Sequence, residues 1–222
     1  PQIRAALRRH RVTPAPANTT PGNAGKKPVS LGKRVGAHAT PTTPVTPATP
    51  GTTPTTGSPL RVGTNIFGQA TPDATGWKGS FFSVPAGTLK VPDLATMTPN
   101  GILFAKSLNI ANTPMTGGFP GIDATRNENF AIRWEAPLIV DTESDYSFRL
   151  VSDDGAIVKI DNTLIVDNDG VHTVTEKSGP VHLITGTHAI TVDYFQASGP
   201  VALQLFCKKG TAAEQVCPTH LL

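Results

Sequence analysis

Acidic residues are absent from the first 72 positions of this 222-residue chain. All 16 Asp and Glu residues lie at or after Asp73, whereas 8 of the 19 Lys and Arg residues precede Leu60. The first 59 residues therefore carry a formal charge of +8, and the remainder carries 11 − 16 = −5. The net charge of +3 conceals two oppositely charged parts, so it does not indicate a nucleic-acid-binding domain.

Residues 1–59 also lack aromatic side chains, but they contain 11 Pro and 12 Thr residues. Repeated Thr-Pro steps favour extended chain, because Pro fixes its own φ and restricts the preceding residue. Without aromatic side chains to stack on bases, nucleic acid is not an expected partner. We interpret residues 1–59 as a basic tail that is either a solvated linker or a segment that docks on neighbouring copies of the chain.

Long hydrophobic runs and familiar catalytic motifs are missing as well. No run of about 18 apolar residues occurs, so no transmembrane segment is expected. No signal peptide is visible, but the sequence starts at Pro1 and not at Met, which is compatible with an export segment removed upstream of it. Nucleophile, phosphate-loop and dinucleotide motifs are absent, and the adjacent carboxylates of Asp153 and Asp154 cannot flank a glycosidic bond from two sides. We therefore expect no enzymatic activity.

Only two cysteines are present, Cys207 and Cys217. A disulfide between them would close a small C-terminal loop, add roughly 2–3 kcal/mol of stability and imply an oxidising compartment. Two free thiols are the alternative. A metal site has little support, because no third Cys or suitably spaced His accompanies them.

Residues 60–207 carry the pattern of one all-β domain. Short β-rich runs begin at Trp77, with apolar residues alternating in segments such as 146–150, 190–194 and 201–205. Turn pairs such as Asp154-Gly155 and Asp169-Gly170 separate the runs. The pattern predicts an antiparallel β-sandwich of jelly-roll type, followed by a short segment 208–222. The Pro- and Gly-rich stretch 85–129 predicts irregular loops over one sheet.

An ordered series of motifs resembles a known family, the domain named after the fourteen-kilodalton fragment of anthrax protective antigen, and above all its fibro-slime type. The resemblance covers about residues 76–207. It is carried by Gly76-Trp77-Lys78-Gly79-Ser80-Phe81-Phe82, Phe119-Pro120-Gly121, Phe130-Ala131-Ile132-Arg133-Trp134, Tyr146-Ser147-Phe148, Ser152-Asp153-Asp154-Gly155, Ile160-Asp161, Val166-Asp167-Asn168-Asp169-Gly170-Val171-His172, Gly186-Thr187-His188 and Tyr194-Phe195-Gln196.

The resemblance implies a β-sandwich module of secreted glycosidases, adhesins and toxins that often recognises carbohydrate. In lectin-like members an Asp-Asp pair joined by a cis peptide binds Ca²⁺, which holds sugar hydroxyls. That pair would be Asp153-Asp154 here, with Gln196 at a second-loop ligand position and Asn168 and Asp169 as weaker oxygen ligands. Ala197-Ser198 departs from the pattern, because neither residue supplies a carboxylate.

A purely structural role for the acidic pair stays open, because Asp side chains often cap turns by accepting backbone N–H bonds. The histidines show no zinc-type spacing, and His172 and His188 are expected to lock turns. Trp77, Trp134 and Tyr194 are expected to pack in the core rather than to bind sugar.

The sequence thus favours a non-catalytic, secreted or cell-surface recognition and adhesion module that binds a glycan, with Ca²⁺ as a possible cofactor. The alternative is a structural subunit of an extracellular assembly whose tail docks on neighbouring copies.

Overall fold

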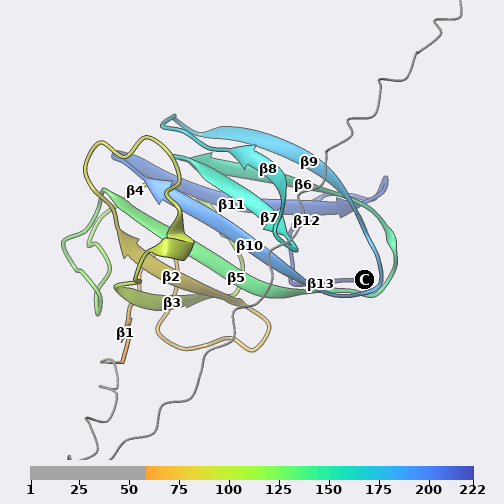
Figure 1. The fold of residues 1–222 in the computed structure, drawn as a ribbon, viewed down its shortest axis with the longest axis horizontal. Coiled ribbons are helices and arrows are strands. Elements are labelled where there is room, and N and C mark those ends of the chain that lie inside the picture. Colours follow the sequence, from red (N-terminus) through yellow and green to blue (C-terminus); the bar gives the residue numbers. More distant parts are fainter. Residues whose placement is uncertain (1–58) are drawn as a thin grey trace, which may run out of the picture. The chain divides into compact units, whose positions relative to one another are not determined.

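The structure, a computed structural model, describes residues 59–222 and confirms the predicted all-β sandwich. The tail predicted for residues 1–59 lies, except for its last residue, outside the described part. Two sheets pack around a shared core (Figure 1). The larger contains β1 (Arg61–Val62), β2 (Trp77–Ser83), β3 (Gly101–Ala105), β5 (Phe130–Val140), β7 (Ala156–Ile160), β8 (Thr163–Asn168), β10 (Gly186–Gln196) and β13 (His220–Leu221). The smaller contains β4 (Asn109–Pro114), β6 (Ser144–Asp153), β9 (Thr175–Leu183), β11 (Pro200–Lys209) and β12 (Gln215–Val216).

The order of strands in the larger sheet is β1-β3-β2-β5-β10-β7-β8. The long central strands β5 and β10 pair antiparallel along their whole length, from Gly186 opposite Val140 to Gln196 opposite Phe130. In the smaller sheet β6 lies between β9 and β11. Segments far apart in sequence therefore meet at each end of the sandwich.

The core is built on aromatic side chains from several strands and loops. Phe81 lies 4.3 Å from Phe119 and Phe119 lies 4.9 Å from Phe130, measured between ring centroids. Trp77, Trp134 and Tyr194 are at most 1% exposed, so the prediction that they pack in the core is confirmed. Such rings each remove a large apolar area from water and dominate the packing energy.

The prediction of irregular loops over 85–129 is wrong for two segments, because β3 and β4 lie within it. In β3 the partly exposed positions, Ile102 and Phe104, are apolar too, so no apolar-polar alternation is visible. In β4 the chain runs along one side of β11 and ends at Pro114, a residue tolerated at strand ends and sheet edges.

The remainder of that stretch does cover a sheet. Val84 and Leu94 pack on Phe82, Ala131 and Phe195 in a second, smaller hydrophobic cluster, separate from the main core. The 3₁₀ turn η1 (Leu94–Thr96) carries Leu94 into this cluster, and Asp93 caps its start by accepting a bond from the N–H of Ala95.

The sandwich continues beyond residue 207. β12 pairs with β11, and β13 pairs in parallel with β5. A disulfide joins Cys207 to Cys217, as one of the two sequence alternatives predicted. Within the described part of the chain no helix is long and apolar enough to span a membrane.

Candidate functional site

One end of the sandwich gathers the loops that carry most of the predicted site residues. Gln196, at the end of β10, lies opposite Phe130, at the start of β5, and Phe130 lies opposite Ser83, at the end of β2. On the other side of β10, Ala156 begins β7 and pairs with Asn168 at the end of β8. Of the acidic pair, Asp153 ends β6 and Asp154 follows it in the turn to β7, at this same end.

Asp154 connects its own turn to the β8–β9 and β10–β11 loops. Its Oδ1 accepts a bond from the backbone N–H of His172 at 3.0 Å. Its Oδ2 accepts bonds from the N–H groups of Ala197 at 2.8 Å and Ser198 at 3.4 Å. The side chain is 3% exposed, and the peptide bond that joins it to Asp153 is cis, as the resemblance implied. Asp154 thus has the structural role that the sequence left open for this pair.

Asp153 is in a different electrostatic position. It is 5% exposed, and burial together with the negative charge of Asp154 raises its pKa. His172 and the backbone N–H of Val174 oppose this shift. No side chain of the described residues forms an ion pair with Asp153. An ionised Asp153 would therefore be stabilised by an arriving cation or donor.

Gln196 braces the same turn and is fully buried. Its Oε1 accepts a bond from the N–H of Asp154 at 3.0 Å and lies 2.6 Å from the hydroxyl of Tyr194. Its Nε2 donates to the carbonyls of Ser198 at 2.7 Å and Pro200 at 3.0 Å. Oε1 therefore accepts one backbone bond and lies beside a hydroxyl whose single proton has a second acceptor within reach.

Tyr194 completes this buried network. Its hydroxyl also lies 2.6 Å from the carbonyl oxygen of Asp153. Burial, followed by the charges of Asp154 and Asp153, raises its pKa well above the usual value, so the phenol stays protonated and can donate. The sequence indicated a core role for Tyr194 but not this contact.

Asn168 and Asp169 fix neighbouring loops. The amide of Asn168 donates to the hydroxyl of Ser152 at 2.8 Å and to the carbonyl of Thr175 at 3.0 Å. Oδ1 of Asp169 accepts bonds from the N–H groups of Val91 at 2.7 Å and Gly170 at 2.8 Å. Asp169 thereby ties the covering loop to the β8–β9 turn.

The predicted turn-locking histidines do contact turns. The ring of His172 lies 3.0 Å from the carbonyl of Asn168 and 2.9 Å from that of Thr173. The ring of His188 lies 2.6 Å from Oδ2 of Asp161 and 3.0 Å from the carbonyl of Ile184.

A calcium ion fits this site only in part. Ca²⁺ takes six to eight oxygen ligands. Asp153 has lone pairs beyond the bond from the N–H of Val174, and Oδ1 of Asp154 has one beyond the bond from His172. Oε1 of Gln196 keeps one when the hydroxyl of Tyr194 donates to the carbonyl of Asp153 instead. Residues 59–222 contain no group of three or more His, Cys, Asp or Glu side chains placed to hold a metal. Backbone carbonyls, water or ligand hydroxyls would have to supply the remaining oxygens.

These features define a class: an antiparallel β-sandwich with a buried acidic pair in the loops at one end. The family model described as PA14 domain matches residues 110–217. The sequence motifs resembled the same family over about residues 76–207. No curated protein matches the chain.

Solved structures share the fold. The "PA14 sugar-binding domain from RTX adhesin" is 13% identical, with a TM-score of 0.58 over 66% of this chain and 97% of that one. The "PA14 domain of MpAFP Antifreeze protein" is 14% identical, with a TM-score of 0.57 over 68% and 92%. An "anti-sigma factor domain-containing protein from Clostridium clariflavum" is 20% identical, with a TM-score of 0.51 over 65% and 45%. At these identities the likeness concerns the fold alone.

Proposed function

We propose that this chain is a non-catalytic carbohydrate-recognition module of a secreted or cell-surface protein, with its binding site at the loop end that carries Asp153 and Asp154. The observation that carries the proposal is the buried carboxylate of Asp153, which has a raised pKa and no cationic partner among the described residues. The shared fold with a solved domain titled as sugar-binding supports it. The disulfide supports an oxidising location.

The loops supply both kinds of surface that a sugar requires. Asp153 offers carboxylate oxygens for hydroxyl groups or for a cation, while Asp154, Gln196 and Tyr194 hold the turn rigid. Val171 and Val174 are 51% and 40% exposed beside His172, and they offer apolar contact to the C–H face of a sugar ring.

Calcium enters the proposal through the same carboxylate. We infer that Asp153 and the remaining lone pair of Asp154 hold the ion. When bound, it would offset their negative charge and coordinate sugar hydroxyls. Gln196 positions the turn through its bond from the N–H of Asp154.

The test compares the wild-type protein with Asp153→Asn, a change that removes the charge but keeps the size. We expect calorimetry to show at least tenfold weaker Ca²⁺ binding by the variant and a glycan array to show loss of Ca²⁺-dependent signals. Glu135→Gln, on the exposed face of β5, is the matched control. Wild-type behaviour of Asp153→Asn in both assays would overturn the proposal.

A second proposal, a structural subunit of an extracellular assembly, is supported by the opposite charges of residues 1–59 and the rest of the chain. It does not exclude recognition, and it predicts a particle larger than the monomer that requires residues 1–59.

A further inference from the structure

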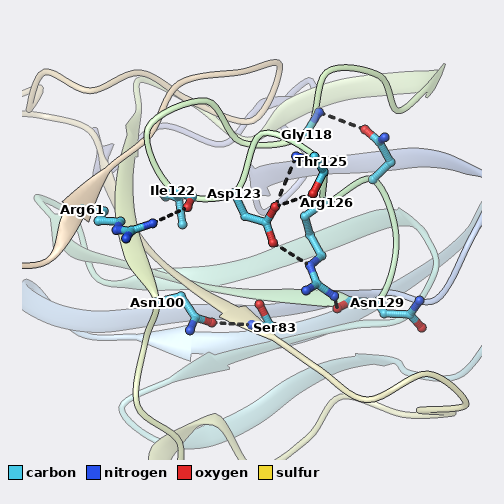
Figure 2. Close-up of polar contacts among 10 residues, drawn as sticks. Arg61, Ser83, Asn100, Gly118, Ile122, Asp123, Thr125, Arg126 and Asn129 are labelled. Carbon is cyan, nitrogen blue, oxygen red and sulfur yellow. Dashed lines mark hydrogen bonds and ion pairs between the residues drawn. The ribbon is translucent and has the colours of Figure 1, made fainter.

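A second polar hollow lies at the same end of the sandwich, on the side away from β7. It has a volume of about 500 Å³ and is lined by Arg61, Ser83, Asn100, Ile122 and Asp123. Figure 2 shows Arg61 on one side, Asn100 with Ser83 on another, and Asp123 with Arg126 facing them. We refer to it as the Arg61 pocket.

The backbone around the pocket is built to bring these residues together. β1 pairs in parallel with β3, with Arg61 opposite Gly101. A Cβ at Gly101 would lie 2.5 Å from Cγ1 of Ile122, so only glycine lets Ile122 pack here. The carbonyl of Ile122 then accepts a bond from Nη1 of Arg61 at 3.2 Å, which holds the guanidinium at the rim.

The pocket has a surplus of hydrogen-bond donors. Arg61 uses one of its five N–H groups in the bond to Ile122. Oδ1 of Asn100 accepts a bond from the N–H of Ser83 at 2.7 Å, which fixes the amide and leaves its NH₂ group without a partner in residues 59–222. The hydroxyl of Ser83 adds a further donor.

The one carboxylate in the pocket is already engaged. Asp123 accepts bonds from the N–H of Thr125 at 3.2 Å and its hydroxyl at 2.9 Å, and it forms an ion pair with Nε of Arg126 at 3.2 Å. These contacts, the Thr125 hydroxyl first, lower its pKa. Asp123 is therefore a paired group.

Arg61, in contrast, has no carboxylate within ion-pair distance in the part of the chain that the structure describes. Residues 1–58 contain no acidic side chain that could pair with it. An unpaired guanidinium beside a fixed amide NH₂ group suits an oxyanion, to which arginine donates two parallel bonds.

The position of the pocket relates it to the acidic pair. Two strand spacings separate Ser83 on β2 from Gln196 on β10, with β5 between them. Four spacings separate Arg61 on β1 from Gln196. At roughly 4.8 Å per strand these separations are about 10 and 19 Å, which a short oligosaccharide can span. Arg61, Ser83 and Asn100 precede residue 110, where the family match begins, whereas Ile122 and Asp123 lie within it.

We propose that the Arg61 pocket is a second subsite that binds the carboxylate or sulfate group of an acidic saccharide. The further step, that the same saccharide also reaches Asp153, rests on the proposed function. Anion binding in the pocket does not depend on it.

The experiment is an NMR titration of the ¹⁵N-labelled full chain with methyl β-D-glucuronoside, glucose 6-sulfate and methyl β-D-glucoside. We expect the two anionic probes, and not the neutral one, to shift the side-chain amide of Asn100 and the backbone amide of Ser83. Comparison of the first two probes distinguishes carboxylate from sulfate recognition. Equal shifts with all three probes, or none, would overturn the proposal.

Variants of the pocket make the assignment specific. We expect at least tenfold weaker binding of the anionic probe in Arg61→Ala, an intermediate loss in Arg61→Lys, which keeps the charge but not the paired donors, and weaker binding in Asn100→Ala. Lys208→Ala removes the same charge at the far end of β11 and should bind like the wild type. Wild-type affinity of Arg61→Ala would refute the subsite.

Asp153→Asn separates this proposal from the one before it. The variant should keep the shifts at Asn100 while losing oligosaccharide affinity. Normal oligosaccharide binding by Asp153→Asn would refute the acidic-pair site. The Arg61 pocket would still be tested separately by the titration with anionic probes.

Discussion

At the scale of single residues, Asp153 and Asp154 show how neighbouring, chemically identical groups acquire different roles. Asp154 accepts three backbone N–H bonds from two other loops, whereas the charge of Asp153 is disfavoured by burial and by Asp154. A carboxylate that satisfies several backbone donors stabilises the fold, and a buried one without a cationic partner is a candidate for ligand binding.

The first prediction is a contrast between these two residues. Asp154→Ala should lower the free energy of unfolding by about 2–4 kcal/mol, because three backbone donors lose a charged acceptor. Asp153→Asn should leave it unchanged or raise it at neutral pH without Ca²⁺, because the folded state disfavours the ionised carboxyl. Urea unfolding measures both, and an equal loss in the two variants would contradict the assignment of roles.

A second residue-scale prediction concerns pH. His188 has a raised pKa, chiefly because of its bond to Asp161, and Asp161 has a lowered pKa, chiefly because of the same bond. The histidine contributes stability that is complete below about pH 6.5 and is lost as the pH rises through its folded pKa. The aspartate contributes stability that is present above about pH 4 and is lost on acidification.

The pair should therefore be most stabilising between about pH 4 and 6.5. Between pH 5.5 and pH 8.5 the free energy of unfolding should decrease more for the wild type than for His188→Gln. The difference between the two proteins is the informative quantity, since the pKa of His182, beside Asp145 and Glu143, is also raised. A decrease of the same size in both would exclude the contribution of His188.

At the scale of elements, the packing of β2 beside β5 depends on a glycine, which has no side chain. Gly79 lies opposite Trp134, and a Cβ there would lie 2.7 Å from Cζ3 of the indole ring. The ring is fully buried, so it cannot move aside without displacing its neighbours.

Gly79→Ala should accordingly destabilise the domain by about 1–3 kcal/mol, although alanine is otherwise acceptable in a strand. Ser80→Ala, at the next position of β2 and on the opposite face, should change stability by about 0.5 kcal/mol or less. Thermal unfolding followed by tryptophan fluorescence would measure both. A neutral Gly79→Ala variant would mean that the close contact is not a constraint.

At the scale of the whole molecule, charge divides the chain more sharply than composition does. The first 59 residues carry +8 and no aromatic side chain, and the part from Leu60 onward carries −5 and every aromatic residue. The buried core of the described part starts at Phe67. Stability and assembly should therefore depend on different parts of the chain.

We expect a chain shortened to residues 60–222 to unfold within a few degrees of the full chain. Light scattering at low and high salt tests the assembly proposal on the same pair of proteins. A mass above the monomer that requires residues 1–59 and decreases at high salt would support docking between oppositely charged parts. A monomeric full chain at all salt concentrations would refute docking and leave recognition as the function.

Much of this fold could be predicted from the sequence, because alternating apolar residues and turn pairs are local patterns. Alternation of apolar residues predicted strands such as β6, β10 and β11, and turn pairs such as Asp154-Gly155 marked their ends. β3 and β4 were missed because one has apolar residues on both faces and the other runs at a sheet margin, so neither alternates. The disulfide was one of two alternatives until β12 placed Cys217 beside β11.

The site was predicted by its residue types but not by their partners. Sequence alone determined a β-sandwich with an acidic pair, a glutamine and a basic tail. Only the tertiary structure decided that Asp154 and Gln196 accept backbone bonds from other loops, that Asp153 is buried without an ion pair among the described residues, and that Arg61 contacts Ile122 across 61 positions of the chain. Hydrogen-bond partners so distant in sequence are set by strand order and register, which no local pattern of side chains records.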